Sequence, residues 1–414
     1  MWKTALSQQS LRISSTSTRP EIELLLCCAR TQINSRIAAQ IEMLLEQELD
    51  WDYLLQIAFQ RNVAPLLYWS LNTTCLGVPK HVLNQLQNYF QANAQRNLLL
   101  TRELLKLLAL CEQQEILALP YKGPVLATHV YGNLSLRQFS DLDILVHPRD
   151  ITRAKDLLLS QGYQPLIELS GAERMLHFQS SAYNHKFFVR KDGRIDFLEL
   201  HWRVTPPYFI CPFELESSWE RLETLSLAGV TVLSFPVEDL LLILCIHGSK
   251  DHWQKLGWIC DVAELIRAQP GLNWDQVTAR ARKLGYERML SLGLLLAHDL
   301  LDTVLPKEII KSKIQNDSTA KSLAQQICEQ LFSLDAGPLS GIEKHLYYLR
   351  LREKWRDKGS YLLYQTRGKV RPNIKDRAVF SLPSGLSFLY YPLRPIRLVR
   401  EYSLSILKEL GRFL

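Results

Sequence analysis

The sequence lacks several features that would assign its class directly. Its eight cysteines form no Cys-x-x-Cys pair and follow no secretory signal, which argues against a disulfide framework and a structural zinc site. No repeat of fixed period is present. The longest apolar runs are too short, or too interrupted by Pro, Gly and Ser, to cross a bilayer. We therefore expect a reduced cytoplasmic protein with no integral membrane segment.

The composition is that of a globular protein. The chain has 414 residues, of which 47% are hydrophobic and 22% are charged, and this length predicts two or three packed units. The formal net charge is +7. A basic balance suits a phosphate-bearing partner or a peripheral contact with an anionic surface, although a mild excess over this length is usually a solvated surface.

The spacing of apolar residues changes along the chain and predicts its organisation. Three- and four-residue steps indicate helices, and short apolar runs bounded by turn residues indicate strands. The predicted regions are a disordered tail at 1–18, helices at 19–113, a sheet core at 114–235, helices at 236–335 and a basic, aromatic region at 336–414. Strands are predicted near 118 and at 143–146, 163–167, 186–190, 195–202 and 231–235. The predicted fold class is α+β with an α/β core, in which a small mixed sheet is flanked by helical regions.

Two aspartates open one of these strands. Asp141 and Asp143 are two residues apart, so both carboxylates lie on one face of an extended strand. Mg²⁺ needs hard oxygen ligands and usually takes one or two carboxylates plus substrate phosphates. A later strand offers Asp196 and Glu199 on opposite faces, so only one of these can join the pair. The pattern predicts a site for one or two Mg²⁺ ions.

A turn ahead of the aspartates is the second element of the predicted site. Lys122, Gly123 and Pro124 precede a short helical segment, where glycine lets the backbone approach a phosphate and the helix start attracts anions. Lys122 adds its own charge, and Arg137 offers a bidentate fork from another side. Together with Ser140, these residues form the predicted nucleotide-binding set.

Three histidines are candidates for the acceptor side of the site or for structural roles. His201 shares a strand face with Glu199 and is predicted to pack against that acid or to position it. His247 and Asp251 are four residues apart, a spacing that brings two side chains together on a helix and that metal sites use. The aromatic residues around His252 favour a packed helix junction, with acceptor binding as the alternative.

The order of these motifs resembles the nucleotidyltransferase superfamily of the DNA polymerase β type. More narrowly, it is similar to a bacterial branch of largely uncharacterised nucleotidyltransferases, in the motifs Lys122-Gly123, Tyr131-Gly132, Arg137, Asp141-Leu142-Asp143 and Glu199-Leu200-His201-Trp202. The resemblance implies a nucleotidyltransferase core with Asp141, Asp143 and Glu199 as the metal ligands, and Asp196 as the alternative third acid. It also implies that the Lys122-Gly123 turn lies beside the nucleotide phosphates.

This resemblance implies an enzyme that uses Mg²⁺ and a nucleoside triphosphate (NTP). It would move a nucleoside monophosphate to an unidentified acceptor hydroxyl or phosphate on a small molecule, a protein or RNA. One alternative is a catalytically weak or inactive relative that binds a nucleotide or a partner in a biosynthetic or regulatory assembly, because Lys122-Gly123 stands where the wider superfamily has Gly-Ser or Gly-Gly. A further alternative is an RNA-binding module that uses the basic C-terminal region.

Overall fold

The computed structural model of this chain contains two compact units. The described residues are 19–74, 77–165, 185–190, 197–205, 218–335, 337, 339–370, 376, 379, 382 and 384–397. The first unit is drawn from residues 1–207 and 211–352, and the second from 208–210 and 353–414. Every predicted site residue falls within the range of the first unit.

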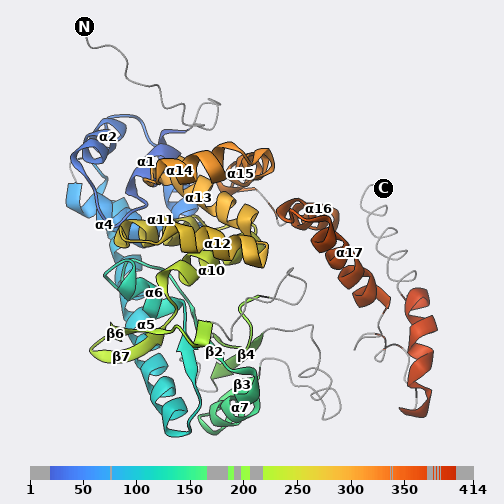
Figure 1. The fold of residues 1–414 in the computed structure, drawn as a ribbon. Coiled ribbons are helices and arrows are strands. Elements are labelled where there is room, and N and C mark those ends of the chain that lie inside the picture. Colours follow the sequence, from blue (N-terminus) through green and yellow to red (C-terminus); the bar gives the residue numbers. More distant parts are fainter. Residues whose placement is uncertain are drawn as a thin grey trace, which may run out of the picture. The chain divides into compact units, whose positions relative to one another are not determined.

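Within residues 19–74 and 77–113, five helices precede the sheet of the first unit. They are α1 (Pro20–Cys28), α2 (Ser35–Leu45), α3 (Trp51–Gln60), α4 (Ala64–Thr74) and α5 (Lys80–Gln113). The starts of α2 and α3 are capped, because the side chains of Asn34 and Asp50 each accept a hydrogen bond from a backbone N–H three residues later. Helix α5 has 34 residues, which corresponds to a length of about 50 Å. It runs alongside the sheet (Figure 1).

The sheet has five strands of mixed direction. They are β1 (Ala118–Pro120), β2 (Asp141–Val146), β3 (Tyr163–Pro165), β4 (His185–Arg190) and β5 (Phe197–His201). Their spatial order is β1-β2-β5-β4-β3, in which β2 and β5 run parallel and the other three pairs are antiparallel. The segments between strands contain α6 (Gly123–His129), the 3₁₀ turn η1 (Pro148–Asp150) and α7 (Ile151–Ser160).

The two faces of this sheet differ because side chains alternate along each strand. Leu142 and Ile144 of β2, together with Leu198 and Leu200 of β5, are buried in one hydrophobic core with residues of α5 and α7. The residues between them on β2 and β5 therefore point to the opposite face. Only the side chains on the opposite face of the two central strands can therefore contribute to a polar site.

A separate hairpin follows the sheet. It consists of β6 (Glu223–Leu227) and β7 (Val230–Ser234). Ala228 and Gly229 form its turn with φ angles of 51° and 83°, the left-handed conformation of a two-residue hairpin turn. Strand β7 was predicted and β6 was not, because most side chains of β6 are exposed or half-buried and show no clear apolar alternation.

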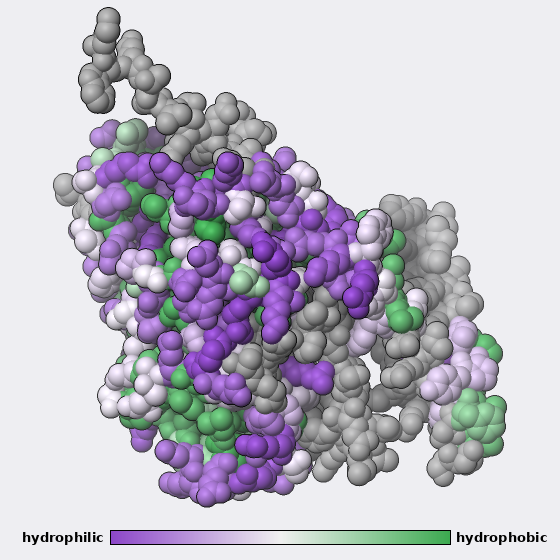
Figure 2. Space-filling view, in the orientation of Figure 1, coloured by the Kyte–Doolittle hydropathy of each residue, from purple (hydrophilic) through white to green (hydrophobic). Residues whose placement is uncertain are grey.

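An apolar groove lies between α5 and this hairpin. Its volume is about 390 Å³, and its lining includes Leu105, Leu108, Val230 and Val232. In the same region Figure 2 shows hydrophobic surface on a face of the first unit that is otherwise mainly hydrophilic. None of the predicted site residues lines this groove, so it is a feature separate from the acids of β2 and β5.

The remaining helices of the first unit follow the hairpin. They are α10 (Val237–Lys250), α11 (Leu256–Ala268), α12 (Trp274–Leu284), α13 (Glu287–Leu301), α14 (Lys307–Ile309), the π-helical turn η2 (Ile310–Gln315), α15 (Ser318–Leu331) and α16 (Gly341–Leu351). Ten of the 14 residues of α10 are buried. A Cβ added at Gly248 would lie 2.5 Å from the fully buried ring of Trp253. Residues around Gly248 and Trp253 are therefore closely packed, which agrees with the packed helix junction that the aromatic residues near His252 predicted.

The second unit contains α17 (Trp355–Val370) and the 3₁₀ segment η3 (Ser384–Leu389). The buried carboxylate of Asp376 accepts hydrogen bonds of 2.5 Å from each of Arg394 and Arg397, whose side chains are also buried. Residues 353–414 hold 13 Lys and Arg against five Asp and Glu. The positive charge of the chain is therefore concentrated in this part of the sequence.

The predicted fold class is confirmed. A small mixed sheet is preceded and followed in sequence by helical regions. The six described cysteines are free and buried. Among the described helices, none combines the length and the apolar character needed to span a bilayer.

Candidate functional site

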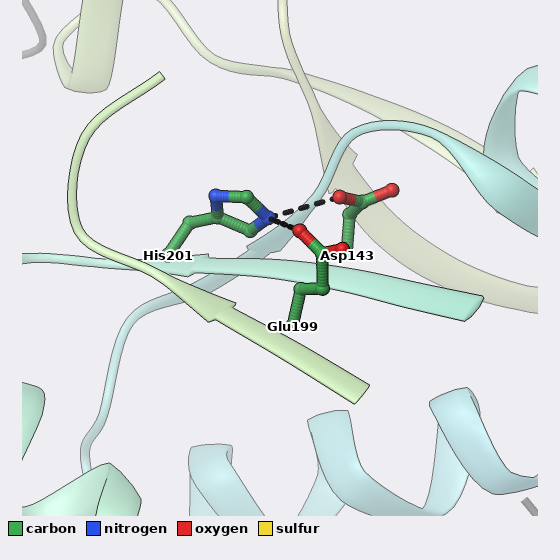
Figure 3. Close-up of side chains that lie close together, drawn as sticks. All are labelled: Asp143, Glu199 and His201. Carbon is green, nitrogen blue, oxygen red and sulfur yellow. Dashed lines mark hydrogen bonds and ion pairs between the residues drawn. The ribbon is translucent and has the colours of Figure 1, made fainter. Parts of the chain in front are cut away.

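The parallel pairing of β2 with β5 brings two of the predicted acids side by side. Asp143 is the register partner of Glu199, and both point away from the core because their neighbours Leu142 and Leu198 point into it. His201 lies two residues beyond Glu199 on the same face. Its Nε2 is 2.9 Å from Asp143 Oδ1 and 3.1 Å from Glu199 Oε2 (Figure 3). The register thus assembles two carboxylates and an imidazole, which we call the Asp143–Glu199–His201 group.

The Lys122–Gly123 turn lies against this group. Gly123 has a φ of +51°, in the left-handed region that favours glycine, and a Cβ there would be 3.5 Å from the Asp141 carbonyl oxygen. The Lys122 ammonium is 3.3 Å from Asp143 Oδ1, and the two side chains are 12% and 3% exposed. The turn therefore adds a largely buried positive charge beside the carboxylates.

The surrounding charges shift the pKa values of the two aspartates in opposite directions. Burial alone would raise the pKa of Asp143, but the Lys122 ammonium and the hydrogen bond to His201 outweigh burial and hold this pKa well below its usual range. Burial and the negative charge of Asp143 raise the pKa of Asp141 to about 6. For His201, burial lowers the pKa, but the bonds to Asp143 and Glu199 outweigh it and raise the pKa overall. A second negative charge at Asp141 is thus unfavourable without an added cation.

Asp141→Asn is expected to stabilise the metal-free protein at neutral pH. In the fold Asp141 keeps its proton up to about pH 6, whereas in the unfolded chain it ionises near pH 4. The stability from this group is therefore complete below about pH 4 and is lost as the pH rises through 6. Removing the charge should raise the free energy of unfolding by on the order of 2 kcal/mol at pH 7, with little change near pH 4.

Urea unfolding of the native protein and of Asp141→Asn at pH 7 and pH 4 in chelator measures this difference. Asp156→Asn is the matched control, because the Asp156 side chain is 62% exposed and its substitution should change stability by less than about 0.5 kcal/mol at either pH. An Asp141→Asn variant that is no more stable than the native protein at pH 7 would contradict the expected repulsion.

The donor set of the Asp143–Glu199–His201 group fits a divalent cation. One ligand atom from each residue lies within 4.8 Å of the other two. Carboxylate oxygens suit Mg²⁺ and Mn²⁺, and an imidazole nitrogen suits first-row transition metals. Of the three acids predicted as ligands, the group contains two, Asp143 and Glu199. Asp141 lies on the same face of β2 and is not part of the group at this distance.

Arg137 is engaged in a buried ion pair. Its Nε and Nη2 donate to Asp261 Oδ1 and Oδ2 at 2.8 and 2.9 Å, and the Tyr131 hydroxyl donates to the same carboxylate at 2.7 Å. Amide groups of Asn93 and Asn97 on α5 donate to the Arg137 carbonyl at 3.3 and 2.9 Å. Arg137 was predicted to bind a nucleotide phosphate, but in this structure its guanidinium is bound by the Asp261 carboxylate of α11.

A small pocket adjoins the site and contains His247. Its lining includes Tyr121, Lys122, His247 and Lys250. The Nδ1 of His247 lies 3.3 Å from Asp251 Oδ2, as the four-residue spacing predicted. Burial and the charge of Lys122 hold the pKa of His247 well below its usual value, so its imidazole is neutral at pH 7. The pocket is thus lined by a neutral imidazole and by two positively charged lysines.

Among the described residues, two other predicted ones, His252 and Ser140, are not part of the Asp143–Glu199–His201 group. His252 packs against Tyr347 and Tyr348, with ring centroids 4.5 and 5.3 Å apart. Ser140 is exposed and immediately precedes β2. Asp196, the alternative third acid, lies outside the described residues.

Sequence reasoning missed two partners in this region. It placed His201 on one strand face with Glu199 but did not connect it with Asp143, which lies 58 residues away. It did not connect Arg137 with Asp261, because 124 residues separate them and no local pattern links them. Both omissions concern contacts between segments distant in sequence.

Comparison with known proteins identifies the family. Residues 47–302 match the family described as uncharacterised nucleotidyltransferase. No curated protein matches the sequence. Among solved structures, the chain is similar to the solution structure of the antibiotic-resistance factor ANT(2″)-Ia, with 13% identity, a TM-score of 0.30, and coverage of 46% of this chain and 91% of that chain. Because the family match extends over more than half of its length, this chain belongs to the family of uncharacterised nucleotidyltransferases.

Proposed function

We propose that this protein transfers a nucleoside monophosphate from an NTP to an acceptor hydroxyl or phosphate, with a divalent cation at Asp143 and Glu199. The acceptor oxygen forms a bond to the α-phosphorus, the bond between the α-phosphorus and the bridging oxygen breaks, and pyrophosphate leaves. The observation that carries this proposal is the register pairing of Asp143 with Glu199, with Asp141 on the same face. Membership of the family supports the same reaction class.

Each charged residue of the site has a role in this reaction. A bound divalent cation supplies polarisation of the transferred phosphate and neutralises charge on the leaving pyrophosphate. Asp143 and Glu199 would hold this cation, and Asp141 would ligate it or a second ion. Lys122 supplies positive charge for the nucleotide phosphates. The Glu199 side chain is 18% exposed, against 3% for Asp143, so Glu199 is the more accessible of the two carboxylates, and accepting the proton of an acceptor hydroxyl is its alternative role.

The surroundings of the site favour an anionic or polar acceptor. The adjoining pocket offers the neutral imidazole of His247 as a hydrogen-bonding group and the ammonium of Lys250 as a cation. Independently of the site, residues 353–414 of the second unit hold 13 basic against five acidic residues, a balance that attracts phosphate-rich molecules such as RNA. RNA is therefore the first acceptor class to test, ahead of proteins and small molecules.

Isotope transfer tests the reaction. The purified full chain is incubated with Mg²⁺ or Mn²⁺, each of the four NTPs and cell extract. We expect label from α-³²P-NTP to enter an acceptor with release of an equal amount of pyrophosphate, and label from γ-³²P-NTP to remain in pyrophosphate. Digestion of the labelled product with ribonuclease or protease then identifies the acceptor class.

Two outcomes would contradict nucleotidyl transfer. Metal-dependent NTP binding without α-label transfer or pyrophosphate would support the inactive, nucleotide-binding alternative instead. Entry of the γ-label into the acceptor would indicate phosphoryl transfer. A parallel reaction with Asp143→Asn protein, prepared in the same way, detects transfer by contaminating enzymes.

A further inference from the structure

His201 has the geometry of a metal ligand as well as that of a hydrogen-bonding partner. Ligands about 2.1 Å from an octahedral cation are about 3.0 Å apart when they are neighbours at right angles. The Nε2 of His201 lies 2.9 Å from Asp143 Oδ1 and 3.1 Å from Glu199 Oε2. Both separations are those expected of an imidazole nitrogen that shares one cation with each oxygen, and the ligand atoms of the three residues all lie within 4.8 Å of one another.

The fold holds the imidazole of His201 in this position. The residue is at the end of β5, its side chain is 5% exposed, and its ring packs edge-on against Tyr121 at 5.4 Å between centroids. Asp143, its closer partner, is on the neighbouring strand in register with Glu199. Because all three side chains come from paired strands of one sheet, the donor set is arranged before any cation arrives.

We propose that His201 is a metal ligand together with Asp143 and Glu199, and that this mixed site selects Mn²⁺ or another first-row transition cation over Mg²⁺. Imidazole binds such cations well, whereas Mg²⁺ favours oxygen ligands and water. Coordination uses the Nε2 lone pair, so the ring proton lies on Nδ1 in the loaded site. The inference rests on the proposed function only for the presence of a divalent cation at this site.

Electron paramagnetic resonance with Mn²⁺ alone tests the assignment. In the metal-free full chain we expect bound Mn²⁺ to show electron spin echo modulation from one directly coordinated nitrogen. His201→Gln should remove this modulation and weaken Mn²⁺ binding by about 10-fold or more, with a smaller loss for Mg²⁺. His81→Gln is the matched control, because His81 is an exposed histidine on α5, and it should leave the nitrogen signal and both affinities unchanged.

Bound Mn²⁺ without nitrogen modulation in the native protein would overturn the assignment, as would equal Mn²⁺ and Mg²⁺ affinities that His201→Gln does not alter. If His201→Gln fails to fold, His201→Asn and ¹⁵N-histidine labelling of the native protein provide the same readout. Transfer of α-label without a nitrogen ligand would sink this inference and leave the proposed function intact. Nitrogen-ligated Mn²⁺ without NTP turnover would support the His201 assignment and contradict the proposed function.

Discussion

Asp143→Asn is expected to abolish metal-dependent nucleotide binding. Asp143 Oδ1 contacts both Lys122 Nζ and His201 Nε2, and its backbone is in register with Glu199, so this carboxylate is at the centre of the proposed site. Asparagine keeps the shape but replaces a charged oxygen with an amide, which is a poor ligand for a hard cation. Loss of an outer-shell partner alone costs about 10–100-fold in metal affinity. Loss of this ligand should therefore weaken metal binding and nucleotidyl transfer by at least about 100-fold.

Calorimetric titration with Mg²⁺ or Mn²⁺, with and without NTP, measures the loss. Asp156→Asn on α7 is again the matched control, because it removes an exposed carboxylate outside the proposed site and should bind metal and NTP as the native protein does. Circular dichroism establishes that both variants are folded. Native-like titrations of Asp143→Asn would remove this carboxylate from the metal site and, with it, the main support for the proposed function.

Among the substitutions proposed for this protein, Asp261→Asn is expected to cause the largest decrease in the free energy of unfolding. The Asp261 carboxylate is 2% exposed, and Arg137 is 11% exposed beside it, so the substitution leaves a buried guanidinium without its counter-charge. Removing one partner of a buried, hydrogen-bonded ion pair typically costs about 3–5 kcal/mol. The substitution also replaces the charged oxygen that accepts the hydrogen bond of the Tyr131 hydroxyl, either with the neutral amide oxygen or with the amide nitrogen. We expect a decrease of this size in the free energy of unfolding, measured by urea denaturation.

Asp302→Asn is the matched control for this loss. It removes the carboxylate from the Arg36–Asp302 pair, whose charged atoms are 2.8 Å apart and whose side chains are 66% and 55% exposed. Asparagine also tolerates the left-handed backbone at this position. Its expected cost is about 0–1 kcal/mol. If Asp261→Asn is too unstable to purify, Tyr131→Phe should cost about 1 kcal/mol. Equal stabilities of the Asp261 and Asp302 variants would show that the buried pair contributes no more than a surface pair.

Much of the fold was predictable because it follows from local periodicity. Short apolar runs bounded by turn residues identified β2 and β5, and three- and four-residue spacing identified the helical regions before and after the sheet. Strand β6 escaped prediction because its side chains are mostly exposed or half-buried. The Ala228–Gly229 turn, with both φ angles positive, was the available sign of a hairpin, and its glycine is the residue type that such turns favour.

The sequence by itself determined which residues can share a strand face. The two-residue period places Asp141 with Asp143, and Glu199 with His201, whatever the rest of the fold does. Only the tertiary structure decided that β2 and β5 pair in parallel with Asp143 opposite Glu199, that Lys122 reaches Asp143, and that Arg137 is bound by Asp261. The physical reason is that strand register and buried ion pairs depend on contacts between segments far apart in the chain, which no local pattern encodes.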